Sequence, residues 1–531
     1  MFTNTNISFE KSKSINQLLQ DYLNKSESTL PLYKQYPNVA GFKNLIESKP
    51  YQSIQREQLF QIVYNQNKHL ASISDKTAQN IQSLKENHCY TITTGHQLCL
   101  FTGPLYFIYK ILSTIQLCET LKKEFPNCCF VPVYWMASED HDFEEINHFH
   151  LFGKKLSWQS SETGAVGAFK TNTLNVIFEE LKSVLGTSDN ANQLLSVFEE
   201  AYLKHQTLAD ATRFLANHLF AEYGLVIVDG QDLAFKKQFT PFFEKDIFEN
   251  TCFQNVQESI GYLNHNNYQA QVNPREINCF FLTEQSRNRI EYKDGKYHLV
   301  GREQSFSASE LKEIIQHSPE KISPNVVLRP LYQQHILPNL AYIGGPGELA
   351  YWLEFKQMFD AMGIQFPILV PRNFFSIIDR SQKNKIDKLN LQAEDFFNSE
   401  KEIVDTFQAN SNAIFELNNE KAELEKLYHQ ILENLNNIDK SLSGSVMAEL
   451  QKNINSLNII EAKANKALKQ KSETEINQIK GIKQKLFPEN MPQERYDNFA
   501  PYYLKYGQAF ISEIYKHVDA FDFNHHLLIE N

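Results

Sequence analysis

The sequence has 531 residues, of which 42% are apolar and 22% are charged, and its formal net charge is −11. These proportions are typical of globular proteins, so large-scale disorder is not expected, and the length predicts about two to four domains. The acidic balance argues against nucleic-acid binding. No stretch approaches the roughly 20 apolar residues needed to span a membrane, and the N-terminus lacks a secretory signal pattern. We therefore expect a soluble cytoplasmic protein that binds neither nucleic acid nor membrane.

The cysteines argue against disulfide and zinc chemistry. There are seven, an odd number, and no two form a CxxC pair. A disulfide framework and a cysteine-rich zinc site are both disfavoured by this pattern. We predict free thiols in a reducing cytosol, no zinc and no metal-ligand set.

The first part of the chain predicts a helical segment followed by a parallel sheet. Residues 1–86 are polar, contain few Gly or Pro and favour helices that pack on the core. Residues 89–94 (CYTITT) predict a buried strand, a helix follows to about Phe125, and residues 130–137 predict a second strand. Strand, helix and strand in about 50 residues form a βαβ unit, and hence a parallel sheet.

Further strands of this sheet are expected at residues 225–229, 325–329 and 366–372, which end on Asp, Arg and Arg. Charged residues at strand ends suit a doubly wound sheet, where ligands bind beyond the carboxyl ends of the strands. The alternative is that a strand ending in solvent simply finishes on a polar residue. We place this core at residues 87–384.

Two insertions interrupt the core. One lies near residues 151–170 and resembles a small β excursion, and the other lies near residues 250–320. Within the second, Asp294-Gly295 separates two alternating segments, which predicts a β-hairpin.

Residues 385–487 predict an antiparallel hairpin of helices. Apolar residues recur with heptad spacing from Leu417 to Leu442, and residues 441–445 (SLSGS) contain the turn signal. Two arms of similar length would meet at Gly444 and reach about 60 Å each. Self-association is expected, the alternative being an isolated arm without a partner. Residues 488–531 are compact and aromatic, and we expect them to return to the core.

A glycine-histidine turn follows the first strand, in TTGHQLCLFTGP. Thr102 or Gly103 can cap the next helix, and Pro104 suits its first turn. A helix N-terminus beside an imidazole binds anions, and His96 could donate to a developing negative charge. The arrangement is similar to that of the HxGH motif in class I aminoacyl-tRNA synthetases, although that motif is not present. The alternative is a helix start with an incidental histidine.

An acidic stretch follows the second strand and runs from Ser138 to His148. Glu139, Asp140 and Asp142 could hold sugar hydroxyls, an ammonium group or magnesium. Asp140 or Asp142 could orient His141 as a general base. The alternative is a solvated acidic loop.

A third polar stretch is LRPLYQQHILPNLAYIGGPGELAYW. Arg329 could clamp a carboxylate or phosphate, and Glu348 could bind an ammonium group. Gly344, Gly345 and Gly347 form a tight turn into a helix where a ligand can approach the backbone. Neither a P-loop nor a dinucleotide fingerprint occurs.

Together these segments closely resemble the family of the bacillithiol biosynthesis cysteine-adding enzyme, the BshC cysteine ligases. The segments that carry the likeness are TTGHQLCLFTGPLYFIYK, PVYWMASEDHDFEEINH, LRPLYQQHILPNLAYIGGPGELAYW and LFPENMPQERYDN. The resemblance covers nearly the whole chain in the same order. It implies an α/β fold: a Rossmann-like parallel sheet core with small inserted subdomains and a long coiled-coil domain that forms a homodimer.

The resemblance also implies a reaction, in which cysteine is joined by an amide bond to the amine of glucosaminyl-malate. Because a free carboxylate does not acylate an amine, we expect activation by ATP, with magnesium. Anionic groups would lie at Gly95, at Thr102-Gly103 and at Gly344, Gly345 and Gly347.

The substrate-binding residues expected on this basis are Thr94, Gly95, Gln97, Glu139, Asn147, Arg329, Glu348 and Arg372. The catalytic candidates are His141, Asp140, Asp142 and His96. Among them, His141 would take the amine proton.

Two other functions remain open from the residues. The chain could be an acyl or nucleotidyl transferase acting on another amine. It could also be a coiled-coil sensor or scaffold that binds a nucleotide or sugar, since no nucleophile–base pair is visible in the sequence.

Overall fold

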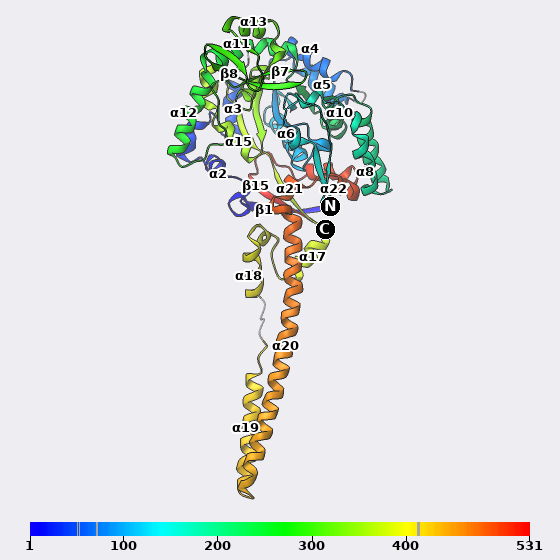
Figure 1. The fold of residues 1–531 in the computed structure, drawn as a ribbon, viewed down its shortest axis with the longest axis vertical. Coiled ribbons are helices and arrows are strands. Elements are labelled where there is room, and N and C mark those ends of the chain that lie inside the picture. The colour runs from blue at the N-terminus through cyan, green and yellow to red at the C-terminus, as the bar shows by residue number, and fades with distance from the viewer. Residues whose placement is uncertain (50, 52–53, 71–72, 411–414) are drawn as a thin grey trace. The chain divides into compact units, whose positions relative to one another are not determined.

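The computed structural model describes residues 1–49, 51, 54–70, 73–410 and 415–531. These residues form two compact units (Figure 1). The first comprises Met1–Ser376 and Pro492–Leu528, and the second comprises Ile377–Met491 and Ile529–Asn531. Among the described residues, no helix has the length and apolar character needed to cross a bilayer.

The first unit is built on a five-stranded sheet in which every neighbouring pair is parallel. Its strands, in spatial order, are β13 (Ile368–Pro371), β12 (Asn339–Gly344), β2 (Cys89–His96), β3 (Cys129–Met136) and β6 (Val226–Asp229). Numbered along the chain, this is the 3-2-1-4-5 order of a Rossmann-like sheet, read from β6 to β13. The predicted α/β class and Rossmann-like core are therefore confirmed.

Both faces of this sheet are covered, as a parallel sheet requires. In β12, the side chain of Tyr342 belongs to one core cluster, while those of Ala341 and Ile343 belong to another. Leu369 and Val370 of β13 divide between the same two clusters. Because consecutive side chains on a strand point to opposite faces, one cluster lies on each face of the sheet.

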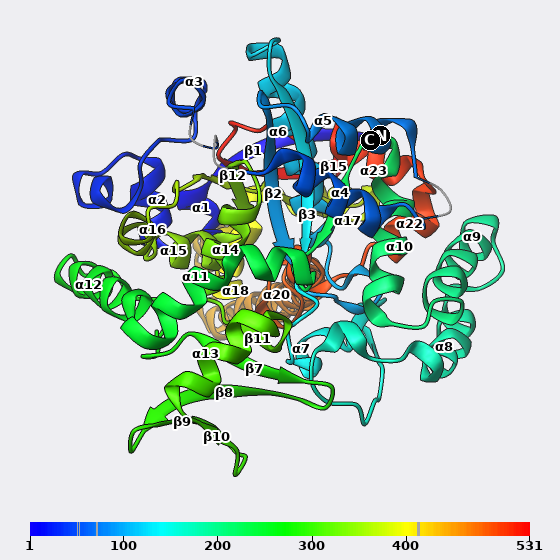
Figure 2. The same cartoon turned by 90° about the horizontal axis from the view of Figure 1, so that it is seen from above.

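Helices of the first unit surround this sheet (Figure 2). They are α1 (Phe9–Ser12), α2 (Gln17–Leu23), α3 (Val39–Glu47), α4 (Arg56–Asn67), α5 (Asp75–Ser83), α6 (Tyr106–Glu124), α7 (Phe143–Ile146), α8 (Asn175–Leu185), α9 (Asp189–Phe198), α10 (Leu208–Phe220), α11 (Leu233–Glu249), α12 (Thr251–His265), α13 (Ala308–His317), α14 (Leu328–Ile336), α15 (Pro346–Leu353), α16 (Lys356–Met362), α21 (Gln493–Tyr496), α22 (Ala500–Tyr506) and α23 (Ala509–Tyr515). The predicted βαβ unit is β2, α6 and β3, whose helix packs on both strands.

Smaller sheets are inserted between the elements of the core. A hairpin is made by β4 (His148–Leu151) and β5 (Lys154–Ser157), and a three-stranded sheet by β1 (Phe2–Ser8), β15 (Asn524–Glu530) and β14 (Phe374–Ile378). An antiparallel sheet has the order β10 (Ser305–Phe306), β9 (Lys296–Leu299), β8 (Ser286–Lys293), β7 (Cys279–Thr283) and β11 (Ile322–Pro324). Asp294 and Gly295 turn between β8 and β9 with positive φ angles of 51° and 77°, which confirms the predicted hairpin.

One predicted strand is wrong. Residues 325–329 do not extend the sheet but lead into α14, whose first amides are capped by Asn325. Its Oδ1 accepts from the backbone N–H groups of Val327 and Leu328, at 2.9 and 3.2 Å. Pro330 also fits a first helical turn. The strand on this side of the sheet is β12, which lies in the third polar stretch, where the sequence predicted only a turn and a helix.

The expected cap of α6 is also wrong. Leu105 occupies the N-cap position, and no side chain caps the helix there. Phe101, Thr102 and Gly103 instead have positive φ angles of 49°, 69° and 62° in a tight turn that precedes α6. The Thr102 hydroxyl is buried and, among the described residues, has no hydrogen-bond partner, so it does not cap the helix.

The second unit contains a long helical hairpin, which confirms the predicted coiled coil. Its helices are α17 (Arg380–Lys388), α18 (Glu400–Asn410), α19 (Asn418–Asn436) and α20 (Ser443–Leu486). Tyr428 of α19 is hydrogen-bonded to Asn453 of α20, and the earlier Lys421 pairs with the later Glu461. Residue numbers therefore increase in opposite directions along the two helices. The two helices are therefore antiparallel.

The turn of this hairpin lies earlier than predicted. Residues 437–442 connect the helices, and Gly444 lies within the first turn of α20. The arms also differ: α20 is one helix of 44 residues, about 66 Å long, while the first arm is divided into α18 and α19. Asp439 favours a turn at this point, because its carboxylate accepts a hydrogen bond from the backbone N–H of Ser441.

Candidate active site

A cavity of about 500 Å³ lies at the carboxyl ends of the central strands. It is lined by residues 95–97 at the end of β2, residues 138–140 after β3, Gly345 and Gly347 after β12, and Arg372 after β13. The strand order reverses between β2 and β12, and this switch point is where open α/β sheets bind ligands. The volume is that of a site for a small molecule.

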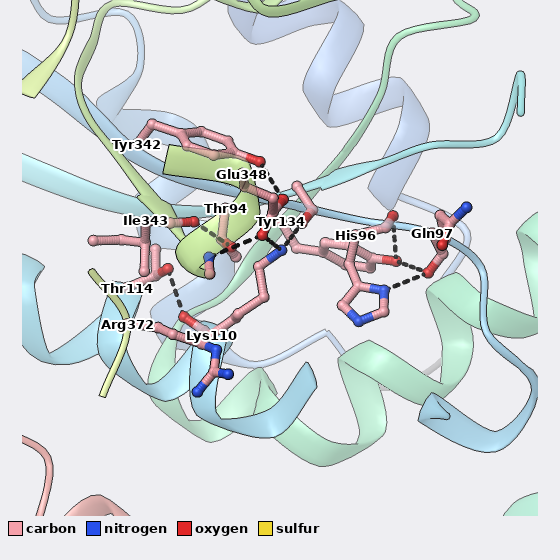
Figure 3. A network of polar contacts seen from close by, with 12 residues as sticks. Thr94, His96, Gln97, Lys110, Thr114, Tyr134, Tyr342, Ile343, Glu348 and Arg372 are labelled. Atoms are coloured by element: carbon pink, nitrogen blue, oxygen red, sulfur yellow. Dashed lines mark hydrogen bonds and ion pairs between the residues drawn. The ribbon is translucent and has the colours of Figure 1, made fainter. Parts of the chain in front are cut away.

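Lys110 of α6 lies at the centre of the polar network on one side of this cavity (Figure 3). Its side chain is 3% exposed, and its ammonium pairs with Glu348 at 2.7 Å and donates to the Gly95 carbonyl. Burial lowers the pKa of Lys110, while Glu348 opposes this shift. Lys110 thus joins α6, the end of β2 and the start of α15 at one point.

Glu348 belongs to the same network, and its carboxylate has three partners within the chain. Its carboxylate accepts from the Lys110 ammonium, from the Tyr342 hydroxyl at 2.9 Å and from the Gly345 N–H at 2.9 Å. Burial by itself raises the pKa of Glu348, but the Lys110 charge and these bonds hold it below its usual value. The ammonium group that Glu348 binds is therefore supplied by the chain itself.

The acidic wall of the cavity is formed by Asp140 and Glu145, which share one amide. The Gln97 side chain donates to the Asp140 carboxylate at 2.9 Å and to the Glu145 carboxylate at 2.8 Å. Although burial opposes ionisation, bonds from His141 and Gln97 hold the pKa of Asp140 well below its usual range. Two carboxylates consequently face the cavity, with Asp140 firmly ionised.

Glu139 lies beside this wall and is held by a buried lysine. Its carboxylate pairs with the Lys236 ammonium at 2.5 Å and accepts from the Ser323 hydroxyl at 3.3 Å. Lys236 is fully buried and also donates to the Ile322 carbonyl at 2.6 Å. Glu139 therefore anchors the loop after β3 to the strand β11.

His141 and Asp142 do not line the cavity, and both side chains are exposed. The Nδ1 atom of His141 lies 3.2 Å from a guanidinium nitrogen of Arg287. The same Nδ1 atom lies 3.5 Å from Oδ1 of Asp140, so the His141 ring contacts two charged residues of the cavity lining from outside. Asn147 is also outside the cavity, where it is buried and bonds to His148 at 3.0 Å.

Three arginines, Arg329, Arg372 and Arg495, form a second, cationic wall of the cavity. Arg329 is half-buried and donates to Gln333 at 3.0 Å, and Arg495 is exposed above the ring of Tyr106. Arg372 is buried and forms an ion pair with Glu494, in which both of its terminal nitrogens donate to the carboxylate. Its Nε atom is also buried, and among the described residues it has no hydrogen-bond partner.

His96 lies between the two walls, packed against aromatic rings. It stacks on Tyr106 with 5.2 Å between centroids and meets Phe107 edge-on at 5.0 Å. Burial lowers the pKa of His96 to about 3, and the nearby Lys110 charge acts in the same direction. The imidazole is therefore neutral at physiological pH.

Only some of the residues expected to bind a nucleotide line the cavity. Gly345 and Gly347 line the cavity at the start of α15, whereas Gly344, Thr102 and Gly103 do not. Thr94 is also away from the cavity, buried in β2 and bonded to the Ile343 carbonyl at 2.9 Å. Helix geometry leaves the amides of the first α15 turn without intrahelical partners, so this end can bind an anion.

Lys110, Arg287 and Arg495 line the cavity but were not predicted from the sequence. For Lys110 a signal existed, because it is the charged residue in the apolar run LYFIYKIL at 105–112. Such a lysine, if buried, must be paired. Arg287 and Arg495 follow ordinary surface patterns, and only folding brings them to the cavity.

The cavity therefore brings together two carboxylates on one wall and several cations on the other. In the part of the chain that the structure describes, no group of three His, Cys, Asp or Glu side chains is placed to hold a metal ion. Such a site can bind a ligand that carries both amines and anionic groups. The Rossmann-like sheet and this polar cavity define an α/β domain that binds a small molecule at its switch point.

Comparison with known proteins identifies the family. Residues 2–373 match the model of the BshC N-terminal Rossmann-like domain of bacillithiol biosynthesis, and residues 375–530 match that of its C-terminal coiled-coil domain. A protein of Flavobacterium psychrophilum named "Putative cysteine ligase BshC" is 43% identical over 96% of each chain. A Flavobacterium johnsoniae protein of the same name is 41% identical over 98% of this chain and 99% of that one, and one from Christiangramia forsetii is 38% identical over 98% of each.

The chain belongs to the BshC family of bacillithiol biosynthesis and is a ligase. The resemblance found in the sequence is thereby confirmed.

Proposed function

We propose that the chain joins the carboxyl group of cysteine to the amine of glucosaminyl-malate, using a nucleotide to activate the carboxylate. The observation that carries this proposal is the division of the cavity into an acidic and a cationic wall. Both substrates contain an amine and at least one carboxylate, so each would be oriented by opposite charges on the two walls. Membership of the family supports cysteine as one substrate, because the relatives carry it in their names.

On the acidic wall, Asp140 and Glu145 would hold the amine of the sugar. Their separation is fixed by Gln97, which binds both carboxylates, so the wall is ordered before the ligand arrives. Preorganised carboxylates bind an ammonium group without the cost of rearranging.

On the cationic wall, Arg329 and Arg495 would hold the malyl carboxylates or the phosphates of the nucleotide. Arginine suits these planar anions because it can donate two parallel hydrogen bonds. The first turn of α15, at Gly345 and Gly347, would bind a further anionic group. Arg372 would contribute through Nε, since its other nitrogens are held by Glu494.

The chemistry requires two substitutions. First, a carboxylate oxygen of cysteine would attack a phosphorus atom of ATP, and the phosphoanhydride bond would break with pyrophosphate or ADP as the leaving group. Then the sugar amine would attack the activated carbonyl carbon, a C–N bond would form, and the C–O bond would break with AMP or phosphate as the leaving group. The proton lost from nitrogen would pass to a carboxylate of the acidic wall, because His141 lies outside the cavity.

Magnesium would enter bound to the nucleotide. Mg²⁺ normally keeps several waters and binds mainly the phosphates of a nucleotide, so it would not require a dedicated set of protein ligands here. The ion would neutralise phosphate charge.

The test is mass spectrometry of a reaction that contains the full chain, cysteine, glucosaminyl-malate, ATP and magnesium, with each component omitted in turn. The expected result is a protein-dependent amide product that disappears without ATP. ATP consumption that needs another amine but not cysteine would favour a different acyl or nucleotidyl transferase. Tight binding of ATP or the conjugate without turnover would favour a sensor.

We also propose that the coiled coil forms a homodimer. Leu427, Ile431, Ile459 and Ile460 are 51%, 37%, 56% and 53% exposed on α19 and α20, which leaves apolar surface for a second copy. Light scattering of the full chain should give twice the mass of 61.7 kDa. Replacing Ile459 and Ile460 with Lys should reduce it to one copy, and an unchanged dimer would place the interface elsewhere.

A further inference from the structure

The His96 ring is held in one orientation by its neighbours. Tyr106 stacks on one face, Phe107 packs edge-on, and Nδ1 lies 2.9 Å from the carbonyl oxygen of Gln97. The Cys99 sulfur is 4.0 Å from the same nitrogen, so the carbonyl is the closer and stronger partner. The other edge of the ring, with Nε2, points away from Gln97 (Figure 3).

These contacts determine which ring nitrogen carries the proton. A carbonyl oxygen can only accept, so Nδ1 must donate, and a neutral imidazole then presents a lone pair at Nε2. Among the described residues, Nε2 is buried and has no hydrogen-bond partner, although His96 lines the cavity. A buried acceptor without a partner is costly, which points to a ligand group that supplies the donor.

The charges around the ring restrict that donor. Lys110 on α6 and Arg372 after β13 both act on His96 as positive charges, while Glu348 on α15 acts in the opposite sense and is paired with Lys110. Arg495 lies over the ring of Tyr106, which stacks on His96. A ligand ammonium would be repelled here, whereas a neutral hydroxyl or thiol would not.

We propose that Nε2 of His96 accepts a hydrogen bond from a neutral O–H or S–H group of the substrate, which makes His96 a specificity-determining residue. This inference rests on the proposed function for the identity of the substrate. In that reaction the donor is the thiol of cysteine or a hydroxyl of the sugar. His96 neither donates to a developing negative charge nor takes a proton, since Nδ1–H is already used and the ring stays neutral.

The test compares two variants by calorimetry with cysteine and with glucosaminyl-malate. H96M removes the acceptor but keeps the bulk, and H96Q keeps an acceptor oxygen. H96M should weaken binding of one compound by about tenfold or more, while H96Q should stay within about threefold of the wild type. Equal affinity of H96M and the wild type for both compounds would overturn the proposal.

S-methylcysteine distinguishes the two sources of the donor. If the thiol is the donor, H96M should bind this analogue as well as the wild type does, because no S–H remains to be lost. If a sugar hydroxyl is the donor, the loss in H96M should appear with glucosaminyl-malate and not with cysteine.

The ring itself is examined separately by NMR of protein labelled with ¹⁵N-histidine, with H96Q used to assign the signal. The expected spectrum is that of a neutral Nδ1–H tautomer from pH 6 to pH 8, values that lie well above the lowered pKa of about 3. An Nε2–H tautomer, or titration in that range, would overturn the proposal. If the protein binds neither compound, the proposed function fails, and the tautomer alone then decides whether His96 presents an acceptor.

Discussion

Arg372 and Glu494 form a buried ion pair, with Nη1 2.8 Å from Oε2 and Nη2 2.5 Å from Oε1. Their side chains are 1% and 3% exposed, respectively. The two residues are 122 positions apart, and the main segment of the second unit, Ile377–Met491, lies between them in the sequence. The pair therefore joins the segments that leave and re-enter the first unit, beside the cavity.

Replacing Glu494 with Gln should destabilise the first unit strongly. The change leaves the Arg372 guanidinium buried and uncompensated, a defect that costs about 3–5 kcal/mol. Urea unfolding followed by circular dichroism measures it. The matched control is E47Q, which breaks the exposed Lys43–Glu47 pair and should cost less than about 0.5 kcal/mol. An equal effect of the two variants would show that burial is not what makes the Arg372 pair matter.

Replacing Lys110 with Met should reduce ligand binding as well as stability. Glu348 loses its cation and the Gly95 carbonyl loses a donor, so we expect a loss of about 2–3 kcal/mol in unfolding free energy. The double variant K110M/E348Q should recover part of that stability, because no unpaired charge remains. Binding of glucosaminyl-malate should stay weak in both. If the double variant recovers binding too, the pair serves only the fold.

The two aspartates of the acidic stretch should behave differently. D140N removes a charge from the cavity wall and weakens the bond from Gln97, so product formation should fall by about a hundredfold. D142N changes an exposed side chain outside the cavity and should stay within about twofold of the wild type. Rates of product formation measured by mass spectrometry separate the two. Equal losses would show that the loop acts as a general acidic surface.

Glu354 should make stability fall as the pH rises. Burial raises its pKa from 4.5 to about 7, although it accepts hydrogen bonds from the backbone N–H groups of Gln271 and Val272. Between those two pH values the folded chain binds more protons than the unfolded chain, so the unfolding free energy decreases with increasing pH. The decrease should amount to about 3 kcal/mol between pH 4.5 and pH 7.5.

The matched variant for this effect is E354Q, which cannot titrate. Its unfolding free energy should change less than that of the wild type over the same pH range, as measured by urea unfolding at several pH values. Parallel pH profiles for the two proteins would show that Glu354 does not titrate in this range.

Much of the first unit follows from local sequence patterns. The β-branched run at 89–94 and the apolar run at 130–137 are strands because buried parallel strands require continuous apolar residues. The heptad spacing from Leu417 similarly predicts the hairpin of α19 and α20, since two helices must bury a shared stripe. Residues 325–329 show the limit of such patterns: a short apolar run suits a strand or a helix, and the Asn325 cap decided the helix.

Which charged side chains meet at the cavity is a matter of tertiary structure alone. The sequence by itself indicated several core strands, the helical hairpin and the family, because periodicity and motifs act over a few residues. It could not determine that Lys110 meets Glu348, or that Arg372 meets Glu494, because these partners are 238 and 122 residues apart. Such pairs form only when the strand order brings several chain segments to one edge of the sheet and burial leaves each charge without water.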